Sequence, residues 1–388
     1  MSFFLIASAI KVFVVFNLIM VGVALLTLLE RRVCAWMQDR LGPNRVGPQG
    51  ILQPAADGLK NFLKEETSPA MADKALFTLA PIVSFVPALL TFGVIPFASP
   101  LPTPWGMVPM VVADLPVGFL YILAISSLGV YGIVLAGWSS NNKYALLGGL
   151  RASAQMISYE IALGMSTVAV LLLAGNVTLS QVIAQQQLAH AWFIVPLSVG
   201  FVIFFISAFA ETNRLPFDLP EAEGELIAGY HTEYSAMKFS MFYIAEYSNM
   251  VTASALMATL FFGGWDIPFT TWDSTGDPSV LKTLLTLAAF GAKTFFFLFT
   301  YIWVRWTLPR FRYDQLMALG WKVLLPLALL YITLLAVAIW FIRIRLGWAY
   351  GTGMAWVLGG LNLVLLIGLV WWLDRGRIVS GSVQEEAA

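Results

Sequence analysis

The chain has 388 residues, of which 59% are hydrophobic, and its mean hydropathy is +0.80. Its 22 Lys and Arg residues balance its 22 Asp and Glu residues, so no basic excess indicates a nucleic-acid partner. A single cysteine and two histidines are too few for a disulfide within the chain, an iron–sulfur cluster or a structural zinc site. The apolar fraction is above that of a soluble domain and predicts an all-α polytopic membrane protein.

Long apolar runs predict the membrane spans, because a transmembrane helix needs about 20 mostly apolar residues. Nine such runs follow one another along the chain, at roughly 4–29, 76–98, 114–137, 157–175, 192–210, 241–263, 281–304, 321–342 and 353–373. The first run lacks the basic start and the small-residue cleavage site of a secretory signal peptide, so we expect it to be a span.

The distribution of Lys and Arg predicts the orientation of these spans. If the N-terminus faces outside, the loops on the inner side hold most of the 22 basic residues. Outer connections, such as FASPLPTPWG, carry Pro and Gly and few charges. Since inner loops are enriched in Lys and Arg, we predict that the N-terminus lies outside and the C-terminus inside.

Residues 51–66, in the first inner loop, show the pattern of an amphipathic helix. Its apolar positions recur at helical spacing, and they are Leu52, Ala55, Ala56, Leu59, Phe62 and Leu63. The opposite face holds Asp57, Lys60, Asn61 and Lys64. Two compatible interpretations stay open, namely a helix in the membrane interface and a connecting helix packed on the inner ends of the spans.

The third inner loop concentrates acidic residues in a chain that is only 11% charged. The window 211–246 holds six Glu residues and one Asp, which are Glu211, Asp218, Glu221, Glu223, Glu225, Glu233 and Glu246. A carboxylate near hydrocarbon needs a partner, a water-filled cavity or a bound proton. If buried, clustered carboxylates have raised pKa values and titrate as a group, so they could share a proton. The alternative interpretation is a solvated acidic loop.

Three carboxylates fall at or inside the fourth, fifth and sixth predicted spans. Glu160 lies near the inner end of the fourth span, Glu211 at the end of the fifth and Glu246 in the first turns of the sixth. An ionisable residue at such a depth is a functional candidate, although it can also be a satisfied polar group that fixes helix packing. Residues 115–137 of the third span hold no carboxylate, and Ser126 and Ser127 lie near the middle of this span. A proton path would therefore use water, hydroxyl groups or Asp114, or enter through spans four to six.

Four inner loops, in order, carry a resemblance to a known family. They read ERRVCAWMQDRLGPNRVGPQGILQPAADGLKNFLKEE, GWSSNNKYALLGGLRASAQMISYE, ETNRLPFDLPEAEGELIAGYHTEYSAMKFSMFYIAE and WVRWTLPRFRYDQLMALGWK. Together they resemble the membrane H subunit of respiratory complex I, the proton-pumping NADH:quinone oxidoreductase, whose mitochondrial counterpart is NADH dehydrogenase subunit 1. The resemblance covers about residues 10–342. It predicts a membrane domain similar to this family at 1–342, followed by an extra C-terminal transmembrane helix and short tail at 343–388.

The resemblance implies a subunit without a redox centre of its own. Such a subunit forms much of the quinone chamber, with spans two to six as a five-helix unit, and couples quinone reduction to proton translocation through inner-side carboxylates. Quinone (ubiquinone in some relatives) would be the substrate, and NADH, FMN and iron–sulfur clusters would belong to partner subunits. The chain itself lacks a dinucleotide-binding glycine fingerprint and a cysteine ligand set, so we expect no NADH site, no cluster and no metal.

The resemblance also assigns residues and a location. The proton-coupling set is Glu160, Glu211, Asp218, Glu221, Glu223, Glu225, Glu233 and Glu246. The quinone-path set is Arg31, Arg40, Asp57, Arg214, Phe217 and Arg305. Any single Arg could instead serve as a positive-inside anchor or pair with a partner subunit. The expected partners are the other complex I subunits, in a bacterial inner membrane or, for an organellar chain, the mitochondrial inner membrane.

Two other functions stay open at this level. The chain could be the homologous subunit of a membrane-bound hydrogenase or related ion-translocating complex that does not use quinone. It could also be a stand-alone secondary transporter, whose carboxylates would be expected in broken helices near the membrane midplane. Most acidic residues here fall on the predicted inner side instead.

Overall fold

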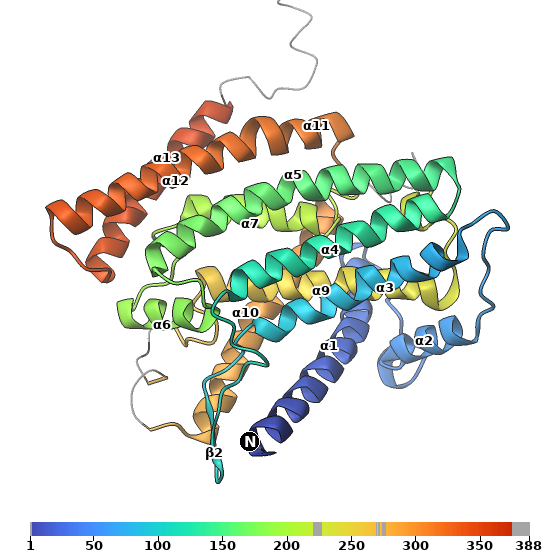
Figure 1. Cartoon of the computed structure of the whole chain (residues 1–388), viewed down its shortest axis with the longest axis horizontal. Coiled ribbons are helices and arrows are strands. Elements are labelled where there is room, and N and C mark those ends of the chain that lie inside the picture. Colours follow the sequence, from blue (N-terminus) through green and yellow to red (C-terminus); the bar gives the residue numbers. More distant parts are fainter. Residues whose placement is uncertain (1, 220–226, 269, 271, 274–276, 375–388) are drawn as a thin grey trace, which may run out of the picture.

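The computed structural model describes residues 2–219, 227–268, 270, 272–273 and 277–374, and they are mostly helical (Figure 1). The α-helices are α1 (Ser2–Met37), α2 (Gln53–Leu63), α3 (Lys74–Leu90), α4 (Gly118–Ser139), α5 (Lys143–Ala174), α6 (Leu179–Ala189), α7 (Ser198–Glu211), α9 (Ala236–Phe261), α10 (Val280–Thr307), α11 (Tyr313–Ala318), α12 (Leu325–Trp340) and α13 (Thr352–Asp374). Short helical turns are η1 (Pro48–Gly50), η2 (Thr91–Val94), η3 (Gly229–His231), and the π-helical η4 (Leu319–Leu324) and η5 (Phe341–Arg345).

Within the described residues, 7 helical segments are long and apolar enough to cross a membrane. They correspond to α1, α3 with η2, α4, α5, α10, the continuous run from α11 to η5, and α13. The fifth and sixth predicted spans correspond to α7 and α9. Because α7 has 14 residues, it is only about 21 Å long, less than the hydrocarbon core of about 30 Å. The count of nine spans and the orientation therefore stay predictions.

Five helices, α3, α4, α5, α7 and α9, form the central bundle (Figure 1). The tilted helices α1 and α10 lie against α9, while α12 and α13 lie against α5 and α7. Close packing in the bundle uses glycine where two helices meet. At Gly132 of α4, a Cβ would lie 2.2 Å from the Ser84 Oγ of α3, so only glycine allows this approach.

Two helices begin at residues that differ from the predicted starts of the corresponding spans. Helix α5 begins at Lys143 rather than near residue 157, because the Asn142 side chain caps it by accepting a hydrogen bond from the Tyr144 N–H. Small residues then let the GGLRASAQ stretch continue as a packed helix. Helix α7 begins at Ser198 rather than near 192, because residues 192–197 form turns. The connection between α5 and α7 also contains the unpredicted α6.

A short antiparallel hairpin departs from the all-α prediction. Strand β1 (Leu101–Thr103) pairs with β2 (Gly106–Val108) in the connection that precedes α4. The Thr103 hydroxyl donates to the Gly106 carbonyl at 2.6 Å, and Gly106 has a φ of 132°, which other residues rarely adopt. Apolar periodicity cannot reveal strands as short as these, because three residues are too few for an alternating pattern.

The sequence-predicted amphipathic helix is α2. Its side chains Leu59, Phe62 and Leu63 are 60%, 72% and 73% exposed, while Asp57 on the polar side pairs with Arg31 of α1. Helix α2 thus lies against α1 and α9 with its apolar side uncovered. An uncovered apolar face is compatible with the predicted place in the membrane interface, which stays a prediction.

Helix α13 is tied to the start of α7 by one buried amide. The Asn362 Nδ2 donates to the Pro196 carbonyl at 2.7 Å, and its Oδ1 accepts from the Val199 N–H at 3.3 Å and from the Tyr331 hydroxyl at 3.0 Å. The first N–H groups of a helix have no partner within that helix, so α13 supplies one for α7. The predicted division at residue 342 stays a prediction, but α13 packs on the rest of the chain.

Replacing Asn362 by Leu is expected to lower the stability of the chain by roughly 2 kcal/mol, because three buried polar groups lose their partner. The measurement is the temperature at which this chain becomes insoluble when the purified complex is heated. Asn17→Leu is the matched control, since within the described part of the chain the Asn17 side chain hydrogen-bonds only to the Phe13 carbonyl of its own helix, at 2.8 Å. Equal shifts in both variants would contradict the assigned role.

A half-buried lysine contacts the C-terminal end of α9. Lys293, in the middle of α10, donates from Nζ to the Phe262 carbonyl at 2.6 Å and the Gly264 carbonyl at 3.0 Å, and lies 4.4 Å from the centre of the Trp192 ring. Carbonyl groups at a helix C-terminus carry partial negative charge, so a cation stabilises that end. The charged residue inside the seventh predicted span thereby anchors α10 to α9.

Candidate functional site

The loop after α7 is held in place by a glutamine of α5. The Gln155 side chain, which is fully buried, donates from Nε2 to the Ala210 carbonyl and the Phe217 carbonyl, both at 2.8 Å. The Phe217 N–H in turn donates to the Arg214 carbonyl at 2.8 Å. Backbone contacts on both sides of Arg214 therefore fix the point from which its side chain extends.

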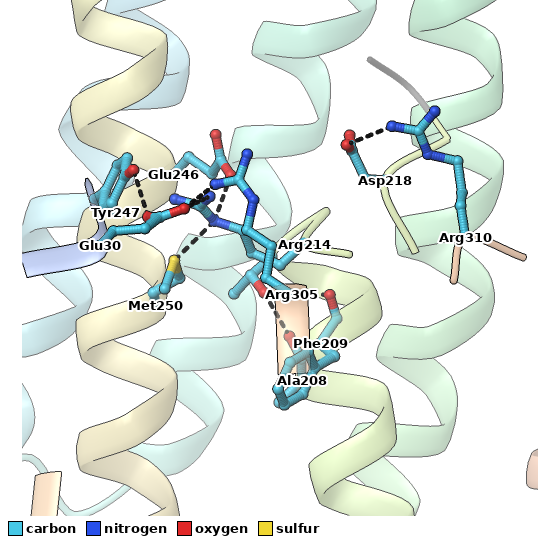
Figure 2. Close-up of polar contacts among 11 residues, drawn as sticks. Glu30, Ala208, Phe209, Arg214, Asp218, Glu246, Tyr247, Met250, Arg305 and Arg310 are labelled. Atoms are coloured by element: carbon cyan, nitrogen blue, oxygen red, sulfur yellow. Dashed lines mark hydrogen bonds and ion pairs between the residues drawn. The ribbon is translucent and has the colours of Figure 1, made fainter. Parts of the chain in front are cut away.

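Arg214 lies between two carboxylates from different helices (Figure 2). Its Nε is 2.8 Å from Glu246 Oε1 of α9, and its Nη1 is 3.4 Å from Glu30 Oε1 of α1. The guanidinium carbon lies 4.3 Å from the centre of the Tyr247 ring, so a cation–π contact adds to the ion pairs. Arg214 is 3% exposed and Glu30 is 5% exposed, so both charges are almost completely removed from water.

Glu30 joins three elements of the chain at this point. Its Oε2 accepts a hydrogen bond of 2.6 Å from the Tyr247 hydroxyl, and its Oε1 pairs with Nη1 of Arg305 from α10 as well as with Arg214 (Figure 2). We call Glu30, Arg214, Glu246, Tyr247 and Arg305 the ionic junction. The ionic junction connects α1, α9, α10 and the loop after α7.

The charges of the ionic junction balance, with two carboxylates against two guanidinium groups. Burial lowers the pKa of Arg214, but Glu246, Tyr247 and Glu30 outweigh burial and raise it well above its usual value. Arg214 therefore stays charged. A buried ion pair is tolerated only when its charges and hydrogen bonds are matched, and the removal of one partner leaves a costly unpaired charge.

A second group of carboxylates lies next to the ionic junction. Glu160 of α5 and Glu211 of α7 are close enough to interact electrostatically. Ser126 of α4 lies beside Glu211, and its hydroxyl donates to the Leu123 carbonyl at 3.1 Å. Glu211 and Glu246 line the same cavity of about 30 Å³, where α3, α4, α5, α7 and α9 converge. The structure thus brings together three carboxylates of the sequence-predicted proton-coupling set.

Other members of that set have direct partners of their own, although Asp218 also interacts electrostatically with Glu246. Asp218 pairs with Arg310 at 3.1 Å, and Glu233 accepts a hydrogen bond of 2.7 Å from Asn142. Glu221, Glu223 and Glu225 fall outside the described residues. These contacts join the third inner loop to neighbouring elements. They are as consistent with residues that hold this loop in place as with residues that couple protons.

The predicted quinone-path residues separate into two places. Arg214 and Arg305 meet in the ionic junction, whereas Arg31 pairs with Asp57 of α2 at 2.6 Å. Burial raises the pKa of Asp57, but Arg31 more than offsets this, so the net pKa is lowered and the pair is ionised.

The remaining two predicted quinone-path residues have local contacts. Arg40 donates to Gln38 Oε1 at 2.7 Å. Phe217 is 4% exposed, and its ring lies 5.4 Å from that of Phe311 and 5.5 Å from that of Tyr159. The Phe217 ring therefore packs against other rings, with little surface left for a ligand.

Glu30 is the site residue that sequence reasoning misses. Its place in the charged sequence Glu30-Arg31-Arg32 indicates only the end of the first predicted span. The helix instead continues to Met37, with Glu30 facing the protein interior. The sequence signal for Glu30 is an acidic residue directly after an apolar run, because such a residue needs a partner from another helix.

His231 makes the folded state sensitive to acid, because burial lowers its pKa from 6.5 to about 4. Between these values the unfolded chain binds more protons than the folded chain, so the contribution of His231 to stability is full above about pH 6.5 and falls as the pH drops towards about 4. We expect His231→Asn to weaken this pH dependence. The measurement is the fraction of the chain that stays soluble after heating, at several pH values; equal pH dependence in both proteins would contradict the prediction.

Among the residues that the structure describes, no group of three or more His, Cys, Asp or Glu side chains could hold a metal ion. Cys34, the single cysteine, is buried and carries no disulfide. The polar groups of the site are thus carboxylates, guanidinium groups, hydroxyls and amides. Such groups can bind and orient a polar ligand and carry protons.

Comparison with known proteins gives consistent matches over most of the chain. The family model described as NADH dehydrogenase matches residues 10–336. An NADH-quinone oxidoreductase subunit of Geobacter metallireducens is 52% identical over 319 residues, covering 82% of this chain and 92% of the relative. NADH-quinone oxidoreductase subunit 8 of Rhodothermus marinus and NADH-ubiquinone oxidoreductase chain 1 of Chondrus crispus are each 49% identical, and each match covers 86% of this chain and 97% of the relative.

Proposed function

This chain belongs to the NADH dehydrogenase family of membrane subunits, and on that premise we propose that it forms part of the quinone chamber of a proton-translocating NADH:quinone oxidoreductase. The relatives are named as NADH-quinone or NADH-ubiquinone oxidoreductase subunits, so the hydrogenase-type alternative is not favoured. The role proposed for this chain is to bind quinone and to couple its reduction to proton movement through carboxylates.

The observation that carries the proposal is the buried, charge-balanced ionic junction. Quinone reduction adds two electrons and two protons, and negative charge develops on the quinone oxygens before the protons arrive. Charges in a poorly hydrated site interact strongly, so new negative charge near Arg214 or Arg305 would weaken the pairing of these cations with Glu30 and Glu246. A carboxylate that loses its cation binds a proton more readily. Quinone chemistry and carboxylate protonation would thereby be linked.

The partners and the location follow from the same premise as proposals. Electrons would come from NADH through FMN and iron–sulfur clusters on partner subunits, since the relatives are named as subunits of NADH-quinone oxidoreductases. The chain would lie in a bacterial inner membrane, or in the mitochondrial inner membrane if it is organellar, with its N-terminus outside. The uncovered apolar side chains of α2 would lie in the interface of that membrane.

Glu246→Gln tests the proposed function in the assembled complex. Glutamine keeps an oxygen that can accept from Arg214 but cannot take up and release a proton. We expect proton translocation and coupled quinone reduction to fall by roughly tenfold or more, in the range seen for the loss of an acid–base group. NADH oxidation with an artificial electron acceptor should stay unchanged, because it needs only the partner subunits.

Asp314→Asn is the control for this experiment, since Asp314 is 70% exposed and pairs with the exposed Arg312. Its activity should equal that of the wild type. If Glu246→Gln and Glu211→Gln both reduced quinone and moved protons at the wild-type rate, a coupling role for these carboxylates would be ruled out.

A further inference from the structure

Two buried aspartates lie together beyond the end of α9 that is far from the ionic junction. Asp266 and Asp273, in the connection between α9 and α10, are 8% and 4% exposed. Their carboxyl groups are close enough to hydrogen-bond to one another when one of them carries a proton. Helix α9 ends at Phe261, roughly four turns or about 22 Å after Glu246 of the ionic junction. The aspartates therefore lie towards the predicted outer side of the membrane.

Neutral donors hold the two carboxyl groups in place but leave one oxygen without a partner. The Trp192 Nε1 donates to Asp266 Oδ2 at 2.7 Å. Asp273 Oδ2 accepts from the Gln187 Nε2 of α6 at 3.1 Å and from the Ile267 N–H at 3.2 Å. Asp273 Oδ1 is buried and has no hydrogen-bond partner among the described residues. A buried oxygen of this kind costs free energy, and a proton shared with Asp266 would supply the missing hydrogen bond.

The charges around the two aspartates favour a proton over a metal ion. Asp273 and Lys293 are the charged groups that act on Asp266, and the Lys293 Nζ donates to the Asp266 carbonyl at 2.5 Å. One cation balances one carboxylate, so a single proton on the other makes the group neutral. The same cation would repel a metal ion. Burial and the nearby Asp273 raise the pKa of Asp266 from 3.8 to about 6, which is in the range where outer pH can change its protonation.

The surrounding elements carry few other titratable groups that could take over this role. In the described part of the chain the nearby ones on α6, on α10 and on the connections beside them are Lys282, Asp277, His190 and Asp114. The Lys282 Nζ lies 5.8 Å from the centre of the Trp272 ring. The other three are exposed, so water and salt screen their charges. Asp273 and Lys293 therefore dominate the electrostatics of Asp266.

We propose that Asp266 and Asp273 form a proton-binding site on the predicted outer side, and that the bound proton holds α6 against the connection between α9 and α10. A proton from water on that side binds to one carboxylate and completes the hydrogen bond to the other. When the proton leaves, two adjacent carboxylates repel one another, and Asp273 is the residue that binds Gln187 of α6. The contact with α6 is therefore stronger in acid. If the proposed function holds, protons delivered to the outer side fill this site.

Hydrogen exchange of the α6 amides in the assembled complex tests the proposal. A raised pKa means that the closed state binds more protons than the open state, so opening becomes easier as the pH rises from about 4 to about 6. After correction for the intrinsic pH dependence of exchange, we expect protection of α6 to fall by roughly tenfold between about pH 5 and about pH 7. Asp273→Asn should remove this dependence, because its amide can donate to Asp266 without titrating. Asp266→Asn should act in the same way.

Asp277→Asn is the matched control, because Asp277 is an exposed aspartate of the same connection. It should keep the pH dependence of the wild type. A wild-type α6 whose protection does not change with pH would overturn the proposal, and so would an unchanged pH dependence in both Asn variants. Loss of protection at every pH in both variants would also overturn it, since the aspartates would then fix the fold without binding a proton.

The measurement needs neither quinone nor NADH, so it separates this inference from the proposed function. Glu246→Gln, which lies at the other end of α9, should leave the pH dependence of α6 unchanged. If that variant keeps full coupling, the proposed function fails while the proton-binding site can stand. If α6 shows no response to pH while Glu246→Gln loses coupling, the proton-binding site fails and the proposed function stands.

Discussion

Arg214→Met is expected to destabilise the chain by about 3–5 kcal/mol, because it leaves Glu30 and Glu246 buried without the cation between them. Arg214 is 3% exposed, so water cannot replace its guanidinium group. A loss of this size is comparable to the total stability of many proteins, so little of the variant should accumulate in the complex. The measurement is the amount of this chain in purified complex, together with the temperature at which it becomes insoluble.

The charge argument predicts a partial rescue of Arg214→Met. Glu30 keeps its ion pair with Arg305 in Arg214→Met, so Glu246 is the carboxylate of the ionic junction that is left without a cation. Adding Glu246→Gln removes this unpaired charge, so the double variant should be more stable than Arg214→Met alone. Arg312→Met is the control, because Arg312 is 77% exposed and its ion pair with Asp314 should contribute less than about 1 kcal/mol. If the double variant were less stable than Arg214→Met, burial of unpaired charge would not be the cause.

Glu30→Gln is expected to loosen the attachment of α1 and to cost about 3 kcal/mol, since two guanidinium groups lose their shared carboxylate. Tyr247 would keep a neutral acceptor, whereas Arg214 and Arg305 would repel one another with only Glu246 to compensate. We expect coupled quinone reduction to fall by at least about tenfold, because the same residues shape the proposed quinone path.

A double-mutant cycle assigns this effect to a particular pair. The losses of stability caused by Glu30→Gln and by Arg305→Gln should be less than additive in the double variant, with an interaction free energy of about 1–3 kcal/mol. Glu66→Gln serves as the control, since Glu66 is 48% exposed and pairs with Lys238 at 3.2 Å. An additive Glu30–Arg305 pair would contradict the direct coupling that the contact implies.

The membrane helices could be predicted because their signal is local. An apolar run of about 20 residues can be recognised without knowing its neighbours. The start of α5 at Lys143 could not be predicted in this way. Its first turns contain polar and small residues, and they are helical because of the Asn142 cap and packing against other helices. The start of α7 depends similarly on Asn362, which is more than 160 residues away in the sequence.

The candidate site can be predicted in part, for a similar reason. Glu160, Glu211 and Glu246 stand out because a carboxylate in an apolar segment is unusual. Glu30 does not, because a charge next to Arg31 and Arg32 resembles the ordinary end of a span. Which arginine meets which acid depends on how distant helices cross, and no spacing in the sequence encodes that. The cavity lined by Glu211 and Glu246 is likewise formed only when five helices converge.

The wide separation of the Glu30 contacts along the chain has a consequence for biosynthesis. Arg214 follows Glu30 by 184 residues and Arg305 follows it by 275. At about 5–20 residues per second, a ribosome needs roughly 10–40 s after making Glu30 before Arg214 exists. During that interval Glu30 must stay hydrated at the membrane surface or carry a proton, because it has no cation to pair with. Helix α1 therefore cannot complete these contacts until synthesis has passed Arg305 in α10.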